Sequence, residues 1–266
     1  MWINMTENVE NKKENIENLN EENLKNQGEK ASEVFKGESN SLTIKQLYEE
    51  SAEYFAVIIK SKLSDKNKTY KLADLGSFKG ELLGNILGKL HDYKFNTIAV
   101  DINEEALKEN SFAQKKIIAT LDKTTLKNKS VDIAICRYVL QWNNQQKQQE
   151  ILKEISRITK GFAIIQHVGA DNENSDKWRE RIDDLLDGEE IPKLKRIGHH
   201  FSSRDEIENW MQENKINFER LTERKVENVS NVFIERYNLN DEESLKTKEI
   251  LGDKNYIIQT TWLIKG

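Results

Sequence analysis

The chain has very little cysteine or proline: one cysteine, Cys136, and one proline, Pro192, among 266 residues. A single cysteine can form neither a disulfide within the chain nor a zinc site of several thiolates, and it fits a reducing compartment. No run approaches the roughly 18 apolar residues of a membrane helix, and the N-terminus lacks the apolar core of a secretion signal. We therefore expect a soluble cytoplasmic protein with no bound metal and no membrane partner.

The chain also lacks a positive charge that would mark a nucleic-acid-binding protein. Its net charge is -5, and residues 1–40 alone hold nine Glu and five Lys, which leaves the rest near neutral. Those 40 residues are polar and low in complexity, so we predict a disordered tail, with folding on contact with a partner as the alternative. A near-neutral body predicts no nucleic-acid partner, although a local basic patch leaves that alternative open.

Residues 41–266 show the periodicity of one α/β domain. A helix is predicted over 44–63, and strands and helices then alternate. The predicted strands are 71–76, 96–102, 115–121, 131–140 and 161–168, and the predicted helices between them are 79–90, 103–110 and 143–160. Asn103 is the expected N-cap of the second of these helices, and Gly161 the expected end of the third. Such alternation is typical of parallel strands joined by right-handed crossovers.

The alternation stops after the fifth strand. Residues 169–198 are predicted to form an insertion that carries a polar helix over the sheet edge. Ser202 or Ser203, with Asp205 or Glu206 three residues later, predicts a capping box and a helix after it. Two half-exposed strands are predicted over 217–227 and 255–266, and residues 228–254 between them are left unassigned.

In an open α/β sheet, ligands bind beyond the carboxyl ends of the strands. The segment DLGSFKG begins with Asp74 at the end of the first strand and has Gly76 and Gly80 in the following turn. This segment is either a cofactor cradle or only a tight turn that needs positive φ angles. Asp101 ends the second strand, where a carboxylate can accept both hydroxyls of a ribose, or can cap the next helix.

The order of DLGSFKG, AVDIN, KKIIATLDKTTLKNKSVDIAICRYVLQW and KGFAIIQHV resembles the class I S-adenosylmethionine-dependent methyltransferases. The resemblance covers residues 45–266. It implies a three-layer α/β sandwich with a mostly parallel seven-stranded sheet, whose last strand is antiparallel, and S-adenosyl-L-methionine as cofactor. The positions that it assigns to cofactor binding are Asp74, Gly76, Ser77, Phe78, Gly80, Asp101, Ile102, Thr120, Leu121, Asp122 and Arg137.

The resemblance also implies individual roles. Asp74 suits the ammonium group of the cofactor and Asp101 its ribose. Thr120 stands where many relatives have an aspartate facing the adenine amine, so Asp122 is the expected substitute. Phe78 occupies the position of the family's middle glycine, which departs from the pattern.

The segment after the fourth strand bears on the acceptor. It lacks the Asn/Asp-Pro-Pro-aromatic tetrapeptide of base and glutamine amide N-methyltransferases. It also lacks a Pro-Cys nucleophile, so Cys136 is expected to be a small buried side chain. The following LQW is similar to small-molecule methyltransferases, including those that esterify carboxylic acids.

Methyl transfer needs a base only if the acceptor must lose a proton. His167 and Tyr138 are the predicted catalytic residues, with His199 and His200 as further candidates; the alternative for His167 is a structural histidine. The insertion carries residues that would suit an anionic acceptor, the alternative being a solvated helix. They are Trp178, Arg179, Arg181, Lys193, Lys195 and Arg196.

We therefore predict a methyltransferase domain over 41–266, with 169–198 as a cap over the acceptor pocket. Its predicted reaction is methyl transfer to a small or medium-sized acceptor, with oxygen favoured as the methylated atom. The alternatives are a tRNA or protein methyltransferase and a methyltransferase-like scaffold without catalysis. A nicotinamide-dependent dehydrogenase is disfavoured, because the turn lacks the G-x-G-x-x-G spacing. The acceptor's identity and the oligomeric state are left open.

Overall fold

The structure is a computed structural model, and it describes residues 42–169, 180–182, 184–185, 191, 200–227, 229–252 and 256–266. The predicted tail, His199 and most of the 169–198 insertion lie outside these ranges. Of the insertion's candidate residues only Arg181 is described. No helix within the described ranges is long and apolar enough to cross a membrane.

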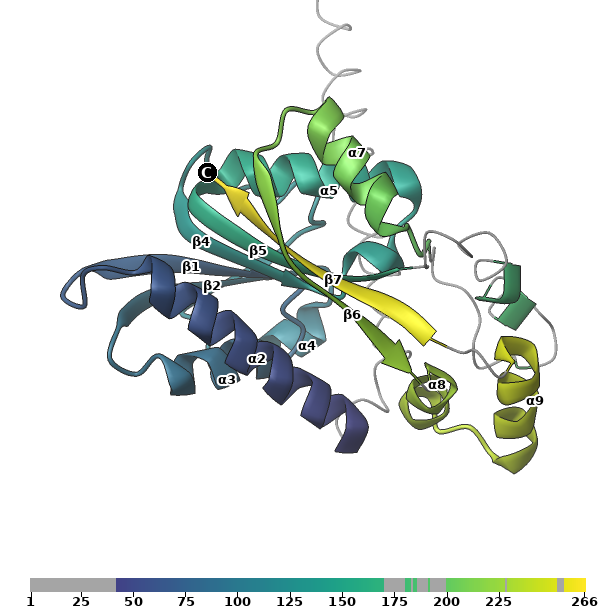
Figure 1. Cartoon of the computed structure of the whole chain (residues 1–266). Coiled ribbons are helices and arrows are strands. Elements are labelled where there is room, and N and C mark those ends of the chain that lie inside the picture. The colour runs from purple at the N-terminus through teal and green to yellow at the C-terminus, as the bar shows by residue number, and fades with distance from the viewer. Residues whose placement is uncertain are drawn as a thin grey trace, which may run out of the picture.

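The core of the chain is a seven-stranded sheet of order β3-β2-β1-β4-β5-β7-β6 (Figure 1). Strands β3, β2, β1, β4 and β5 pair in parallel, and β7 is antiparallel to both β5 and β6. This arrangement confirms the predicted class I methyltransferase type of α/β fold with an antiparallel last strand. The strands are Thr69–Leu75 (β1), Lys94–Asp101 (β2), Lys115–Ile118 (β3), Val131–Arg137 (β4), Thr159–Gly169 (β5), Phe218–Glu227 (β6) and Tyr256–Lys265 (β7).

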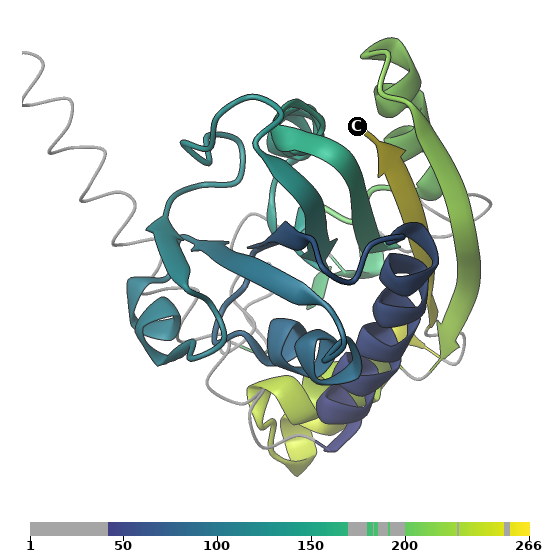
Figure 2. The same cartoon turned by 90° about the vertical axis from the view of Figure 1, so that its left-hand side faces the viewer.

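Helices cover both faces of the sheet (Figures 1 and 2). Helices α2 (Leu42–Lys62) and α3 (Glu81–Lys89) pack on one face, where Phe55 and Leu83 are fully buried with apolar side chains of β1 and β4. Helices α5 (Gln145–Ile158) and α7 (Arg204–Glu213) pack on the other, where they bury Trp262 of β7. The short helix α4 (Glu104–Glu109) joins β2 to β3. The sheet is thus the middle layer of three.

Two helices lie in the stretch that the sequence left unassigned. These are α8 (Val229–Tyr237) and α9 (Asp241–Leu251), and Figure 1 shows both beyond the end of the sheet at which β6 finishes. Asn240 and Glu243 form a capping box at the start of α9. Apolar residues of both helices form a separate buried cluster with Val168, Phe201 and Ile257, and with Ile182, Leu185 and Ile191 from the described part of the insertion. This cluster covers the carboxyl end of β5.

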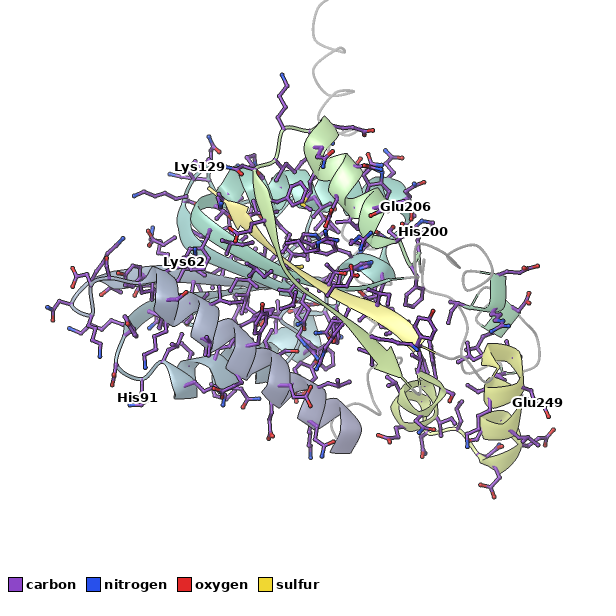
Figure 3. All side chains as sticks on the ribbon, viewed as in Figure 1. Lys62, His91, Lys129, His200, Glu206 and Glu249 are labelled. Atoms are coloured by element: carbon purple, nitrogen blue, oxygen red, sulfur yellow. The ribbon has the colours of Figure 1, made fainter. Side chains whose placement is uncertain are left out.

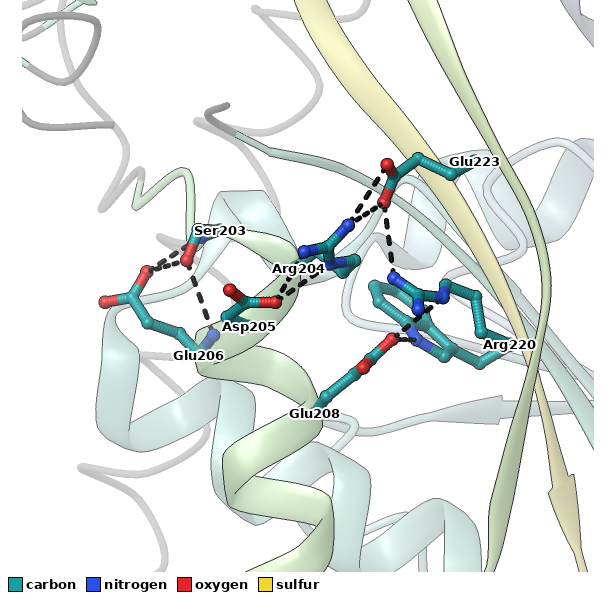
Figure 4. Close-up of polar contacts among 8 residues, drawn as sticks. Ser203, Arg204, Asp205, Glu206, Glu208, Arg220 and Glu223 are labelled. Carbon is teal, nitrogen blue, oxygen red and sulfur yellow. Dashed lines mark hydrogen bonds and ion pairs between the residues drawn. The ribbon is translucent and has the colours of Figure 1, made fainter. Parts of the chain in front are cut away.

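Two of the three predicted helix boundaries are confirmed. The Asn103 side chain accepts a hydrogen bond from the Ala106 amide at the start of α4. Ser203 and Glu206 form the capping box of α7, as Figure 4 shows. The role predicted for Gly161 as helix end is wrong: α5 ends at Ile158, and Gly161 lies inside β5. A Cβ there would come within 2.4 Å of the Asp132 carbonyl oxygen, so close strand approach explains this glycine.

Two predicted strands are shorter than expected. β3 ends at Ile118 rather than residue 121, and β4 ends at Arg137 rather than residue 140. Tyr138 takes a positive φ of 54°, which breaks the extended conformation, and residues Leu140–Trp142 form a 3-10 turn. In sequence, buried apolar residues that follow a strand look like more of the strand, because buried loops and buried strands contain the same apolar residue types.

Candidate active site

The turn after β1 uses both of its glycines for conformation and close packing. Gly76 has φ 75° and Gly80 has φ 85°, a left-handed region that glycine adopts without steric cost. A Cβ on Gly76 would lie 2.3 Å from the Val139 side chain, and one on Gly80 2.4 Å from the Asn110 side chain. The tight turn alone therefore explains both glycines, which is one of the two interpretations that the sequence allows. Evidence for a cofactor cradle must come from other residues.

Phe78, at the position of the family's middle glycine, adopts a backbone conformation that favours glycine. Its φ is 47°, the left-handed region that side-chain-bearing residues rarely adopt. Its amide donates a hydrogen bond of 2.8 Å to Oδ2 of Asp101, which joins the turn after β1 to the end of β2. Strained backbone of this kind persists where the surroundings hold it, often at functional sites. Phe78 thus places a side chain at this position while its amide holds the turn to Asp101.

Asp101 ties the two loops together with its carboxylate. Oδ1 accepts a 2.9 Å hydrogen bond from the amide of Asn103, and burial raises the pKa of the carboxyl despite the backbone amides of Asn103, Phe78 and Ile102. Asn103, and not Asp101, caps the following helix. An ionised carboxylate can accept about four hydrogen bonds, so Asp101 retains capacity for a ligand hydroxyl.

Asp74 lies beneath the turn and is 2% exposed. The Ser77 hydroxyl donates to its Oδ2 at 2.6 Å, and Asn110 Nδ2 donates to the Ser77 oxygen at 2.9 Å. Burial raises the pKa of the Asp74 carboxyl to about 7, against the opposing effect of the Ser77 hydrogen bond, and Asp101 adds to the rise. A cation bound beside Asp74 would favour its ionised form.

The segment after β3 is held by an ion pair. Lys147 of α5 contacts Oδ2 of Asp122 at 2.5 Å. Burial alone would raise the pKa of Asp122, but the Lys147 and Thr120 hydrogen bonds lower it overall. Leu121 is buried in the core and Thr120 is half-buried. A role for these residues beside adenine stays a prediction.

Tyr138 follows β4 and is held by its hydroxyl. That hydroxyl donates to Oε1 of Gln259 on β7, and burial raises the pKa of the phenol, so the neutral form is favoured. The Cys136 thiol before it is 1% exposed and its pKa is raised by burial, which confirms the expectation of a small buried side chain.

His167 is buried on the sheet face that packs against α5 and α7. Its Nε2 donates to the Ser202 carbonyl at 3.0 Å, its ring stacks on Trp262, and its buried Nδ1 has no hydrogen-bond partner among the described residues. Burial lowers the pKa of His167 to about 4, so it is neutral at pH 7. The surroundings favour the alternative of a structural histidine, while the catalytic role stays a prediction.

His200 is the one described histidine of the two beside the insertion. Its amide donates to the Gln141 carbonyl at 2.9 Å, and Figure 3 places it near α7, far from His91. Its backbone thus fixes the 3-10 turn after β4.

A pocket opens between this turn, the start of α2 and helix α8. Its walls are mostly apolar, with Arg137, Tyr138 and Gln141 as the polar residues beside Tyr48 and Trp142. The apolar lining residues are Leu47, Val168, Phe201, Val226, Val229, Val232, Phe233 and Ile257. Arg137, predicted to contact the cofactor, lies in the wall of this pocket. Sequence reasoning missed the contributions of α2, β6 and α8, although a serine on the buried face of α2, Ser51, was a readable signal.

Residues 74–165 match a family model described as a methyltransferase domain. A search of curated protein sequences finds no match. Among solved structures, the chain is similar to the YcgJ protein of Bacillus subtilis at 15% identity, with a TM-score of 0.60 over 80% of this chain and 98% of that one. It is similar to a loganic acid methyltransferase with bound SAH at 12% identity, with a TM-score of 0.57 over 84% and 94%.

A third similar structure is a geranyl diphosphate methyltransferase in complex with GPP and sinefungin, at 11% identity, with a TM-score of 0.55 over 80% of this chain and 78% of that one. At these identities the structural likeness shows the fold, while the sequence match includes Asp74, Asp101 and Arg137. Residues 74–165 therefore match a methyltransferase domain, and the sheet around them has the fold of the class I S-adenosylmethionine-dependent methyltransferases.

Proposed function

We propose that the protein transfers a methyl group from S-adenosylmethionine to an oxygen of a small or medium-sized acceptor that binds in the pocket beside Arg137. The Asp101 carboxylate carries this proposal, because it accepts a hydrogen bond from the Phe78 amide, links the loops after β1 and β2, and can still accept a hydrogen bond from a ligand. This places a carboxylate at the end of β2, next to the turn that begins at the end of β1.

The polar residues at these strand ends fit the cofactor. Asp101 has the chemistry to accept a hydrogen bond from a ribose hydroxyl, and Asp74 has a carboxyl whose ionised form a neighbouring ammonium would stabilise. Ser77 and Asn110 hold Asp74 in place. When bound, S-adenosylmethionine supplies an electrophilic methyl group and a neutral thioether leaving group.

The protein's task in such a reaction is to position the acceptor and exclude water. The apolar walls of the pocket serve both purposes. Neither predicted base is arranged to remove a proton, because Tyr138 is favoured as a neutral phenol and His167 has an inaccessible Nδ1. An acceptor oxygen that is already ionised at neutral pH needs no base, which favours a carboxylate over an alcohol.

The names of two similar structures agree with an acceptor of this kind. One is a methyltransferase of loganic acid and the other of geranyl diphosphate, and both names denote small molecules with an anionic group. We extend this to the present chain as part of the proposal.

The test is calorimetric titration of the purified protein with S-adenosylmethionine and S-adenosylhomocysteine. Asp101→Asn removes the charge and one of the two hydrogen-bond acceptors, and we expect it to weaken binding on the order of tenfold or more, since hydrogen bonds to charged groups contribute about 1.5–3 kcal/mol. Asp92→Asn is the matched control, because Asp92 is an exposed aspartate that pairs with Lys66.

Saturable binding that Asp101→Asn weakens and Asp92→Asn leaves unchanged supports the proposal. Absence of binding by either ligand overturns it and favours a scaffold that has lost catalysis.

A further inference from the structure

Arg137 is a buried cation at the inner wall of the pocket. Its side chain is on the last residue of β4, and the residue is 9% exposed. Nε donates a 2.9 Å hydrogen bond to the Ser51 hydroxyl, which in turn donates to Oε1 of Gln166 at 2.8 Å. The guanidinium lies 4.3 Å from the ring centre of Tyr48 and 3.9 Å from that of Tyr138. These contacts hold the guanidinium against two aromatic rings.

The terminal nitrogens of Arg137 have no carboxylate partner within the described ranges. Four other described arginines do: Arg157 pairs with Glu154, and Arg224 pairs with Glu50. Figure 4 shows the remaining two, Arg204 and Arg220, which reach Glu223 and other carboxylates. All four are more exposed than Arg137. The described Arg181 is also exposed, and it donates to the Leu251 carbonyl. The loss of hydration therefore costs most at Arg137, which has no carboxylate among the described residues to offset it.

Cation–π contacts with Tyr48 and Tyr138 offset part of the cost of removing the Arg137 guanidinium from water. They give its two Nη groups no hydrogen-bond acceptor. A guanidinium fork matches a carboxylate in bidentate geometry. Asp74 is nearby, but its interaction with Arg137 is a charge effect: the charge of Arg137 slightly lowers the pKa of Asp74. The fork is therefore available to a ligand in the pocket.

Gln141 supplies a second unsatisfied polar atom in the same wall. Its Nε2 donates to the Tyr138 carbonyl at 2.8 Å, which fixes the orientation of the amide. Its Oε1 is buried and has no hydrogen-bond partner among the described residues. Buried polar atoms in native proteins are nearly always paired, so this oxygen points to a donor on a bound molecule.

We propose that Arg137 binds the carboxylate of an acceptor whose remaining body is largely apolar, fills the pocket and carries one hydrogen-bond donor for Oε1 of Gln141. This inference rests on the proposed methyltransferase function and names the class of its acceptor. One cation in an otherwise apolar wall neutralises one negative charge, so a monocarboxylic acid fits better than a diphosphate, which carries more charge than Arg137 can neutralise.

The test uses the purified full chain saturated with S-adenosylhomocysteine. Binding is measured by calorimetry for a panel of aliphatic and aromatic monocarboxylic acids, for their neutral primary amides, and for alkyl diphosphates of similar length. We expect at least one acid to bind on the order of 10- to 100-fold more tightly than its amide, as a charge-assisted hydrogen bond predicts. Arg137→Gln should abolish this preference.

Two further variants separate recognition from folding. Arg137→Lys keeps the charge without the fork, and should retain part of the preference for acids. Arg220→Gln changes an arginine outside the pocket that pairs with Glu208, and should retain all of it. Thermal unfolding reports whether each variant is folded, and the Lys variant carries the test if the Gln variant is not.

Equal binding of acids and amides by the native chain overturns the inference, as does a preference that survives in Arg137→Gln. Tighter binding of diphosphates than of acids overturns the assignment to a carboxylate, and so does the absence of binding by the whole panel. The proposed function fails separately, if neither adenosyl ligand binds the native chain.

Discussion

The two halves of the candidate site differ in how their polar groups are satisfied. On the side of β1 and β2, Asp74 and Asp101 bond to loops close in sequence: the Ser77 hydroxyl is three residues from Asp74 and the Asn103 amide two residues from Asp101. On the side of β4 and β5, Arg137 bonds to Ser51 across 86 residues, and Tyr138 to Gln259 across 121. The first half is held in position by its own loops, whereas the second depends on helix α2 and strand β7.

Both halves keep bonding capacity for a ligand: Asp101 can accept a further hydrogen bond, and the buried Nδ2 of Asn103 has no partner among the described residues. The carboxylates of the first half accept hydrogen bonds that the protein itself donates, so this half is arranged before any cofactor binds. In the second half, Arg137 and Gln141 keep unpaired polar atoms within the described part of the chain. Carboxylates that the protein already holds in position suit a cofactor, and unpaired polar groups in the wall of a pocket suit a specific acceptor.

Ser51→Ala should break the second half without disturbing the first. The Ser51 hydroxyl accepts from Arg137 and donates to Gln166, and both partners are buried. Its loss leaves two buried polar groups short of a partner, and we expect a decrease of about 1–3 kcal/mol in the free energy of unfolding. Chemical denaturation measures this loss, and calorimetry should show unchanged affinity for S-adenosylhomocysteine.

The matched control for this prediction is Ser61→Ala on the same helix. The Ser61 hydroxyl donates only to the Ile58 carbonyl within α2, and the residue is exposed. This change should leave the free energy of unfolding within about 0.5 kcal/mol of the native value. Equal effects of the two substitutions would mean that the long-range bridge through Ser51 contributes nothing.

The same contrast explains what the sequence could and could not predict. The alternation of strands and helices, and the residues at the ends of β1 and β2, follow from local patterns, because each turn and cap is formed by neighbours in the chain. The pocket is different. Val226, Phe233 and Ile257 reach it from β6, α8 and β7, and no local pattern predicts which distant segments meet. The buried Ser51 was visible as a polar residue on an apolar helix face, but its partners were not.

Asp74 should make the first half sensitive to pH. Its pKa in the folded protein is about 7, above the ordinary value of 3.8 for an aspartate. A carboxyl whose pKa is raised on folding stabilises the protein fully below the unfolded value, and this contribution is lost as the pH rises through the folded value. Between pH 6 and 8 the native chain should therefore lose about 1 kcal/mol of unfolding free energy relative to Asp74→Asn.

Cofactor binding should show the opposite trend. A cationic ammonium beside Asp74 favours the ionised carboxylate, so the affinity for S-adenosylhomocysteine should rise from pH 6 to 8 in the native chain and stay level in Asp74→Asn. Denaturation and calorimetry at three pH values measure both trends. Matching pH profiles for the native chain and the variant would show that Asp74 does not titrate in this range.

The smallest expected effect concerns the strain stored at Phe78. Its φ of 47° costs a residue with a Cβ roughly 1–2 kcal/mol, while glycine adopts this conformation freely but loses more entropy on folding. Phe78→Gly should therefore stabilise the turn by about 0.5–1 kcal/mol, whereas Phe78→Ala keeps the strain and should give no gain. Thermal unfolding compares the two variants, and calorimetry compares their affinity for S-adenosylhomocysteine. If both bind as the native chain does, the aromatic ring is dispensable and only the Phe78 amide matters to Asp101; if both bind more weakly, the ring itself forms part of the cofactor site.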